Sequence, residues 1–385
     1  MPTTVREQVM LAGYTTLGLG GPAARFVDAD SDEQVIAEVR DADAAGEPLI
    51  VLGGGSNLVV ADEGFPGTVV HVATGGVTIT PSHDGAAAAV TVAAGEDWDA
   101  LAGRCVGEGL SGIECLSGIP GLAGATPIQN VGAYGQEVSE TIVAVRAYDR
   151  LHGTVVTLAN ADCGFGYRTS AFKRSGAPMP NGRTKPARRR AAADPAGATG
   201  RFVVLGVTFR LLRDKLSAPV GYRELARVLG VPEGGRVPLG DARAAVLTLR
   251  RGKGMVLDPG DPDTRSAGSF FTNPVLDLRR LDEVRRRAAA RSGHPAAEVT
   301  VPHFPAGDGQ VKVPAAWLIE QAGFAKGYAG AGGARISSKH TLALTNPGGA
   351  SSASLVGLAR EIRDGVRQVF GVELASEPVL VGTEL

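Results

Sequence analysis

The sequence predicts an α+β fold, in which a strand-rich part with glycine-rich loops precedes a part dominated by helices. Up to about residue 214, short apolar or alternating stretches typical of strands are separated by glycine-rich turns. From Leu225 onward, longer helical periodicities appear, with short strands between them. We therefore expect two or three domains, with the last segment of the chain rejoining the strand-rich first part.

The first part contains two clear helix signals and a series of strand signals. Ser31 is expected to begin a helix, with Gln34 completing a capping box. A second helix is expected over 97–107. The expected strands share short apolar or alternating patterns, and they are 48–52, 58–60, 69–72, 88–94, 142–148, 154–158 and 202–212. The alternation in 142–148 and 154–158 is typical of a pair of adjacent strands.

The second part is predicted to be helical with short strands. Apolar residues recur at helical spacing in four segments, which are 242–251, 276–291, 314–322 and 352–370. A short strand is expected over 341–345, and the last segment, 373–381, returns to a strand-like pattern.

The composition excludes several classes of protein. The chain has 385 residues, a hydrophobic share of 44% and a formal net charge of −1, so nothing in the overall charge favours nucleic acid or an anionic membrane. We see no apolar run long enough to span a membrane and no secretion signal at the N-terminus. Cys105, Cys115 and Cys163 fit neither a metal spacing nor a disulfide framework. We expect a cytoplasmic protein with reduced, mostly buried cysteines, a catalytic cysteine being the alternative.

The most informative stretch is the central loop, which we define as 117–137, SGIPGLAGATPIQNVGAYGQE. It is rich in glycine and nearly free of charge, so its backbone can approach a ligand closely and form concave nests of N–H groups that bind phosphate. Gln129 and Asn130 can both donate and accept hydrogen bonds, as the edge of a ring system would require. We interpret the loop as a cradle for a large, flat, phosphorylated cofactor. The alternative is a glycine-rich surface loop.

A second candidate for a phosphate cradle is GGGSN, residues 53–57. It follows an expected strand, and another strand rather than a helix follows it. This arrangement does not match G-x-G-x-x-G and argues against a nicotinamide-binding Rossmann unit. The alternative is a tight hairpin turn.

Three further segments carry candidate chemistry. In GYRTSAF (166–172), Arg168 suits a carboxylate because its planar guanidinium binds both oxygens, although a surface arginine is the alternative. In GSFFTNP (268–274), Ser269 could donate a proton to a strongly basic carbanion, and a turn cap is the alternative. The cluster Arg250–Lys253 could neutralise phosphates. Glu377 is uninformative by itself.

The segment 175–200 is rich in Pro, Gly, Ala and Arg and has no periodicity. We interpret it as a solvated, mobile insertion between two strands. The run 188–190, three arginines, leaves a contact with nucleic acid or a partner as the alternative.

Together these motifs resemble the UDP-N-acetylenolpyruvoylglucosamine reductase (MurB) family. The resemblance spans most of the chain, in the family's order. It rests on GGGSNL (53–58), the central loop, GYRTSAF (166–172), GSFFTNP (268–274), VKVPAAWLIEQAGFAKG (311–327), ISSKHTLALTN (336–346) and Glu377.

The resemblance implies a flavoenzyme of peptidoglycan precursor synthesis. FAD is expected to bind non-covalently between two lobes of the vanillyl-alcohol-oxidase type. The implied domains are 1–72 and 73–214 for these lobes, with 373–385 returning to the second, and 215–372 for substrate binding. NADPH reduces the flavin, and the enolpyruvyl ether of UDP-N-acetylglucosamine is then reduced to UDP-N-acetylmuramate. The implied partners are these small molecules alone, without nucleic acid, membrane or metal, and the implied state is a monomer.

The resemblance also implies roles for individual residues. Ser269 is expected to protonate the substrate, while Arg168 and Glu377 polarise its carboxylate and stabilise an enolate-like intermediate. The expected substrate contacts are Tyr167, Tyr222, Lys253, Asn273 and Gln321. The expected FAD contacts are Gly53, Gly54, Gly55, Ser56, Asn57, Leu58, Gly118, Ile119, Pro120, Gly121, Gly124, Ala125, Gln129, Asn130, Gly132, Ala133, Tyr134, Gly135 and Arg250.

Two rival functions remain at this point. One is a flavin oxidase of the same cofactor fold that acts on an alcohol or sugar. The other is a non-catalytic binding protein, which would be colourless and would bind polyanions in a salt-sensitive way.

Overall fold

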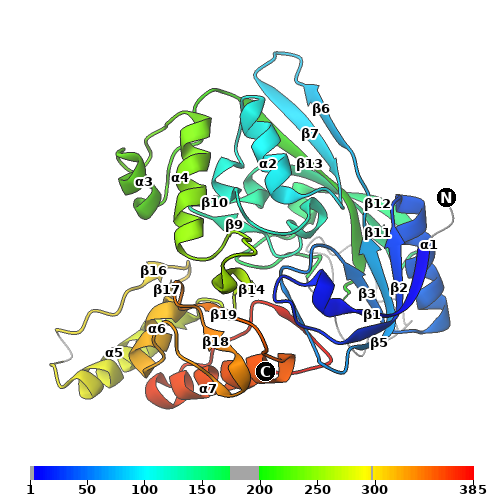
Figure 1. Ribbon diagram of the computed structural model, residues 1–385. Coiled ribbons are helices and arrows are strands. Elements are labelled where there is room, and N and C mark those ends of the chain that lie inside the picture. Colours follow the sequence, from blue (N-terminus) through cyan, green and yellow to red (C-terminus); the bar gives the residue numbers. More distant parts are fainter. Residues whose placement is uncertain (1–3, 174–198, 296–297) are drawn as a thin grey trace. The chain divides into compact units, whose positions relative to one another are not determined.

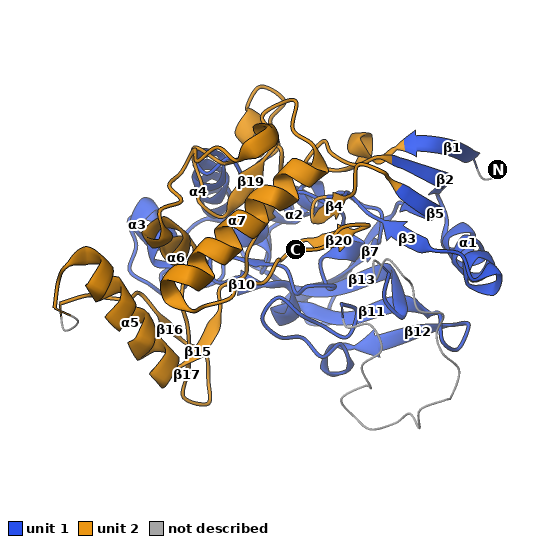
Figure 2. Ribbon diagram, turned by 90° about the horizontal axis from the view of Figure 1, so that it is seen from below, with its two compact units in different colours: residues 1–9, 22–55, 65–256 blue, residues 10–21, 56–64, 257–385 orange. Residues whose placement is uncertain are grey.

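A computed structural model describes residues 4–173, 199–295 and 298–385 (Figure 1). The chain divides into two compact units (Figure 2). Unit 1 comprises 1–9, 22–55 and 65–256, and unit 2 comprises 10–21, 56–64 and 257–385.

The first sheet of unit 1 has the strand order β1-β2-β5-β3, built from Thr4–Met10, Pro22–Ala29, Phe65–Val72 and Leu49–Leu52. β5 pairs in parallel with both β2 and β3. Helix α1 (Asp32–Ala45) connects β2 to β3 and buries its apolar stripe in the same core as Val70. Ser31 caps this helix by accepting the N–H of Gln34 at 3.4 Å, whereas the Gln34 side chain accepts the N–H of Asp30. The predicted helix start is confirmed, with this variation in the capping box.

The second sheet of unit 1 is antiparallel. Its order is β12-β11-β13-β7-β6, and β8 also pairs with β13. The strands are β6 (Val77–Pro81), β7 (Ala87–Ala93), β8 (Leu110–Ser111), β11 (Ile142–Asp149), β12 (Thr154–Ala159) and β13 (Phe202–Arg213). Helix α2 (Trp98–Gly107) begins after Asp97, whose carboxylate accepts the N–H of Ala100 at 2.7 Å. The predicted strands and this helix are confirmed.

Two further helices complete unit 1. α3 (Arg223–Leu229) and α4 (Leu239–Gly252) share a small apolar cluster that includes Leu225, Val246 and Cys115. Because Cys115 lies directly before the central loop, this cluster packs α3 and α4 next to the start of that loop.

Unit 2 is built around α7 (Ser352–Phe370), which packs against α5 (Leu278–Ser292) and α6 (Ala315–Ala322) in one apolar core. One sheet has the order β14-β19-β18 (Ser266–Ser269, Ala343–Thr345, Arg335–Ile336). Another has the order β15-β17-β16 (Val275–Asp277, Gln310–Lys312, Phe304–Pro305). The C-terminal strand β20 (Val379–Val381) pairs in parallel with β4 (Leu58–Val60). The predicted α+β character is confirmed.

Several local interpretations can be compared with these elements. The hairpin alternative for GGGSN is wrong, because β3 before it pairs with β5 while β4 after it pairs with β20. The three cysteines are free and buried, as expected, and burial raises the pKa of each thiol to about 12. The basic insertion, including 188–190, lies almost entirely outside the described residues.

Candidate active site

Two glycine loops, which are the glycines of GGGSN at 53–55 and the central loop, lie against each other in unit 1. A Cβ added to Gly54 would lie 2.8 Å from the Cα of Gly121, so only glycine allows the two backbones to approach this closely. Gly55 and Gly121 have φ values of 57° and 118°. The N–H groups of Gly54 and Gly55 donate no hydrogen bond to any residue that the structure describes. Backbone donors in this arrangement suit an anionic oxygen.

The central loop is anchored at two points in its first half, Gly118 and Gly124. Gly118 donates its N–H to Asp99 Oδ1 at 2.6 Å, and Arg243 binds both carboxylate oxygens of Asp99 at 2.6 and 3.0 Å. Burial alone would raise the pKa of Asp99, but these hydrogen bonds bring it below its usual value. Gly124 donates to the carbonyl of Ala94 at 2.9 Å. The loop is therefore held to α2 and α4 at one point and to the end of β7 at another.

Asn130 shapes the loop from inside. Its side chain is buried, and its Nδ2 donates to Glu137 Oε2 at 2.7 Å and to the carbonyl of Gly166 at 3.2 Å. Its Oδ1 accepts the N–H of Ser139 at 3.2 Å. The side chain predicted to contact a cofactor ring thus bonds to its own protein, across the short β9–β10 pair (Gly132–Ala133 and Gln136–Glu137).

The segment 166–172 is fastened to the central loop at three points. Besides the contact of Gly166 with Asn130, Arg168 donates from Nη2 to the carbonyl of Gly132 at 2.8 Å, and Ser170 donates to Ile128 at 2.5 Å. Arg168 has a φ of 52°, which is uncommon for a residue with a side chain. The structure therefore brings Arg168 to the central loop. Its guanidinium carbon lies 5.6 Å from the centre of the Tyr167 ring.

The end of α4 brings a buried cation to the same loop. Arg250 donates from Nη2 to the carbonyl of Met255 at 2.8 Å. Its Nε is buried and has no hydrogen-bond partner among the described residues. A Cβ on Gly118 would lie 3.4 Å from this Nε. Burial lowers the pKa of Arg250, as expected for a cation whose charge is incompletely solvated. An orphaned buried donor of this kind indicates a place for an anion.

Lys253, just after α4, belongs to a cluster with two tyrosines and one glutamate. Its Nζ lies 2.6 Å from Glu224 Oε2 and 5.6 Å from the centre of the Tyr134 ring. Tyr134 meets Tyr222 edge to face, with ring centres 5.4 Å apart. Burial alone would lower the pKa of Lys253, but the hydrogen bond to Glu224, supported by Tyr134, raises it above its usual value. The ammonium group is therefore kept charged beside the central loop.

In unit 2, the backbone places Ser269, Glu377 and Asn57 on neighbouring segments. The N–H of Glu377 donates to the carbonyl of Phe270 at 2.8 Å, directly after Ser269. The N–H of Val379 donates to the carbonyl of Asn57 at 2.9 Å, and Asn57 Nδ2 lies 3.4 Å from the carbonyl of Glu377. Ser269 is partly exposed and lies at the end of β14. The structure thus brings Ser269 and Glu377 together within unit 2, while Arg168 belongs to unit 1.

The two weaker candidates in unit 2 have different surroundings. Asn273 accepts the N–H of Ala315 at 2.9 Å through its Oδ1, so it caps the start of α6. Gln321 is exposed near the end of α6. Asn273 thus has a structural role that the sequence interpretation did not include.

Sequence analysis missed several residues that hold the site in place. Asp99 and Arg243 anchor the central loop, and Glu224 holds Lys253. Each is a charged residue on a helix, where charged residues are common. The distance in sequence between the partners does not reveal the contact, because each pair joins two different helices or a helix and a loop.

Within 4–173, 199–295 and 298–385, no group of three or more His, Cys, Asp or Glu side chains is arranged to hold a metal ion. No helix in these ranges is both long and apolar enough to cross a membrane.

Comparisons with known proteins show which family this chain resembles. Residues 23–159 match the FAD binding domain family, and residues 261–381 match the C-terminal domain of UDP-N-acetylenolpyruvoylglucosamine reductase. The UDP-N-acetylenolpyruvoylglucosamine reductase of Thermobifida fusca is 56% identical over 100% of both chains. That of Streptomyces coelicolor is 55% identical over 100% of this chain and 92% of its own, and that of Mycobacterium leprae is 47% identical over 99% and 96%.

A solved structure shows the same fold. The reductase (MurB) of Thermus caldophilus aligns over 98% of this chain and 99% of its own, with a TM-score of 0.60 and 24% identity. The matched FAD binding domain includes both glycine loops. The predicted α+β fold with an FAD-binding domain is confirmed.

The residues present fit a dinucleotide cofactor. The N–H groups of Gly54 and Gly55 have no acceptor among the described residues, and the buried Nε of Arg250 likewise has none. Backbone donors and a desolvated guanidinium are the groups that bind a pyrophosphate.

Proposed function

The chain belongs to the UDP-N-acetylenolpyruvoylglucosamine reductase family, and from that premise we propose how its residues carry out the reaction. It is an FAD-dependent oxidoreductase of peptidoglycan precursor synthesis, and NADPH is the reductant. The bound FAD supplies hydride transfer from NADPH to the enolpyruvyl group. Family membership favours this activity over a flavin oxidase and over a non-catalytic binding protein.

We assign the cofactor contacts to the two glycine loops and to Arg250. The N–H groups of Gly54 and Gly55 and the guanidinium of Arg250 would bind the pyrophosphate. The remaining predicted positions of 53–58 and of the central loop would surround the rest of the cofactor mainly with backbone atoms. The observation that carries this assignment is the close approach of Gly54 to Gly121, which brings the two loops together.

The catalytic step assigned to the chain is a proton transfer coupled to charge stabilisation. When hydride adds to the β-carbon of the enolpyruvyl group, the π electron pair moves toward the α-carbon and the carboxylate. Arg168 and Glu377 would polarise that carboxylate where negative charge develops, which is the most effective place for electrostatic stabilisation. Ser269 would donate its hydroxyl proton to the basic α-carbon and recover a proton from solvent. The new C–H bonds at both carbons complete the lactyl ether.

Substrate binding is assigned to five residues. Lys253, held charged by Glu224, would contact phosphate or carboxylate oxygens. Tyr222 would cover the pyrophosphate of the substrate, and Tyr167 would support Arg168. Asn273 and Gln321 complete the proposed set. We further propose the three-domain division 1–72, 73–214 and 215–372, a monomeric enzyme, and a cytoplasmic location, where both NADPH and nucleotide sugars are present.

The test of these roles is a Ser269→Ala variant studied in separate half-reactions. Reduction of the flavin by NADPH should be nearly unchanged, because it requires no proton from Ser269. Reoxidation by the enolpyruvyl substrate should slow by about 10²- to 10⁴-fold, the usual contribution of a general acid. Reoxidation at the normal rate would exclude Ser269 as the proton donor.

A further inference from the structure

Ser269 lies in a strand that does not by itself fix the direction of its side chain. β14 pairs with β19 through Ser266–Thr345 and Ser269–Ala343, and the register is irregular between these pairs. Gly268, directly before Ser269, has a φ of 73°. Because the pairing of β14 with β19 is irregular here, the position of Ser269 depends on residues 337–345. These residues follow β18 and include β19.

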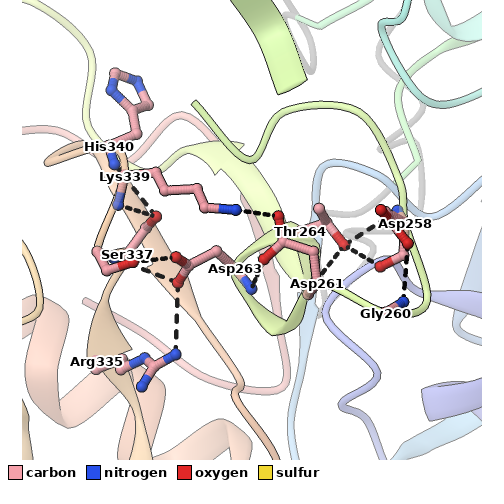
Figure 3. Close-up of polar contacts among 10 residues, drawn as sticks. Asp258, Gly260, Asp261, Asp263, Thr264, Arg335, Ser337, Lys339 and His340 are labelled. Carbon is pink, nitrogen blue, oxygen red and sulfur yellow. Dashed lines mark hydrogen bonds and ion pairs between the residues drawn. The ribbon is translucent and has the colours of Figure 1, made fainter. Parts of the chain in front are cut away.

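That partner segment is a tight turn followed by β19. The Oγ of Ser337 accepts the N–H groups of Lys339 and His340 at 3.0 and 3.2 Å (Figure 3). The N–H of Ser337 donates to the carbonyl of Ala343 at 2.8 Å. The carbonyl of Leu342 then accepts the N–H of Phe270, the neighbour of Ser269, at 2.7 Å. The turn is therefore hydrogen-bonded, through residues 342 and 343, to the backbone next to Ser269.

Asp263 holds the turn from the other side. Its carboxylate is buried and accepts the hydroxyl of Ser338 at 2.5 Å and the N–H of Ser338 at 3.3 Å. The guanidinium of Arg335 lies 3.6 Å from the same carboxylate. Figure 3 shows Asp263 directed at this turn. Asp263 also lies just before β14, the strand that carries Ser269. Its carboxylate therefore connects the start of β14 to the turn at 337–340, which leads into the strand paired with the end of β14.

A second contact next to Asp263 strengthens this connection. Lys339 donates from Nζ to Asp261 Oδ2 at 2.5 Å, and this hydrogen bond lowers the pKa of Asp261. The hydroxyl of Thr264 lies 3.0 Å from the carbonyl of Asp258 and 2.8 Å from that of Asp261. The short segment 258–264 is therefore cross-linked by its own hydrogen bonds on the side from which Asp263 extends.

We infer that Asp263 is a positioning residue for Ser269: through Ser338 it fixes the turn against which the strand of Ser269 pairs. This inference rests on the proposed role of Ser269 as proton donor. A proton donor acts only within hydrogen-bond reach of its target, and a misplacement of about 1 Å costs roughly 10²-fold in rate. Replacing the carboxylate removes the charge that Arg335 faces and one of the two oxygens that hold Ser338.

The experiment compares half-reactions of the FAD-loaded Asp263→Asn enzyme. We expect reoxidation by the enolpyruvyl substrate to slow by about 10- to 100-fold, while reduction by NADPH and the dissociation constant of the substrate stay within about twofold of the wild type. Ser338→Ala should slow the same half-reaction by a smaller factor, and it provides the test if Asp263→Asn does not fold. Asp282→Asn, which makes the same change in an exposed ion pair with Arg285 on α5, is the matched control and should change neither rate.

Combination with Ser269→Ala separates positioning from a general structural role. If Asp263 acts through Ser269, Asp263→Asn should cause no further slowing of reoxidation in the Ser269→Ala background. An equal further slowing there would overturn the inference, as would a parallel loss of both half-reactions together with FAD content. A normal reoxidation rate in Ser269→Ala alone would instead contradict the proposed function, and the inference would fall with it.

Discussion

The contact between the two glycine loops gives a direct test of the cofactor cradle. In Gly54→Ala, the added Cβ would lie 2.8 Å from Gly121 Cα, whereas ordinary Cβ contacts begin at 3.4 Å. The loops must therefore separate by about 0.6 Å, and overpacking of this kind costs about 1–3 kcal/mol. If that cost falls on the FAD-bound arrangement, the affinity for FAD decreases by roughly 5- to 150-fold, since about 1.4 kcal/mol corresponds to tenfold.

The assay is a titration of the apoprotein with FAD, followed by quenching of flavin fluorescence. Thermal unfolding of the apoprotein shows whether the substitution has a separate effect on folding. Gly240→Ala on α4 is the matched control, because a Cβ there meets no atom within 4 Å, and it should bind FAD like the wild type. Wild-type affinity in Gly54→Ala would refute the account of the cradle.

Three further predictions concern charges around the central loop. Replacing Arg250 with Met removes the buried guanidinium and should weaken FAD binding by roughly 10- to 150-fold, about 1.5–3 kcal/mol for a charged hydrogen bond; an unchanged FAD titration would contradict this. In Glu224→Gln, the hydrogen bond to a carboxylate no longer offsets the effect of burial, so the pKa of Lys253 falls. Substrate binding needs the ammonium form, so on raising the pH it should be lost earlier, at a lower pH than in the wild type. If KM begins to rise at the same alkaline pH in Glu224→Gln as in the wild type, the proposed role of Glu224 is contradicted. Asp99 has a lowered pKa in the folded protein, so it stabilises the fold above its usual pKa, and this contribution is lost as the pH falls through the lowered value. In Arg243→Met, burial raises that pKa, so acid unfolding followed by circular dichroism should begin at higher pH, and an unchanged transition would argue against the ion pair.

Local patterns were sufficient to predict most helices and the strands β7, β11, β12 and β13 of the antiparallel sheet, but β1, β2 and β6 were not predicted. The expected helix over 97–107 is α2, and the expected pair of strands is β11 and β12. Glycine is required at position 54 because two backbones approach closely there. Such a requirement is visible in the sequence as a cluster of glycines.

Long-range partners were not predictable in this way. The pairing of β20 with β4 joins the C-terminal segment to residues 58–60, and the contact of Asp263 with Ser338 joins two polar residues that are ordinary individually. Asn130 was expected to face a cofactor ring, whereas its amide is bonded inside the loop. A side chain that can donate and accept serves both uses equally well, so its residue type does not distinguish them.

As a member of this reductase family, the chain is expected to pass electrons from NADPH through FAD to an enolpyruvyl nucleotide sugar. The most direct measurement is an anaerobic absorbance trace of the purified protein during addition of NADPH and then of UDP-N-acetylglucosamine enolpyruvate. We predict that the yellow flavin bleaches with NADPH and recovers when the enolpyruvyl substrate is added. A flavin that bleaches but does not recover with this substrate would contradict the reductase assignment, and a protein that binds no flavin would contradict the cradle itself.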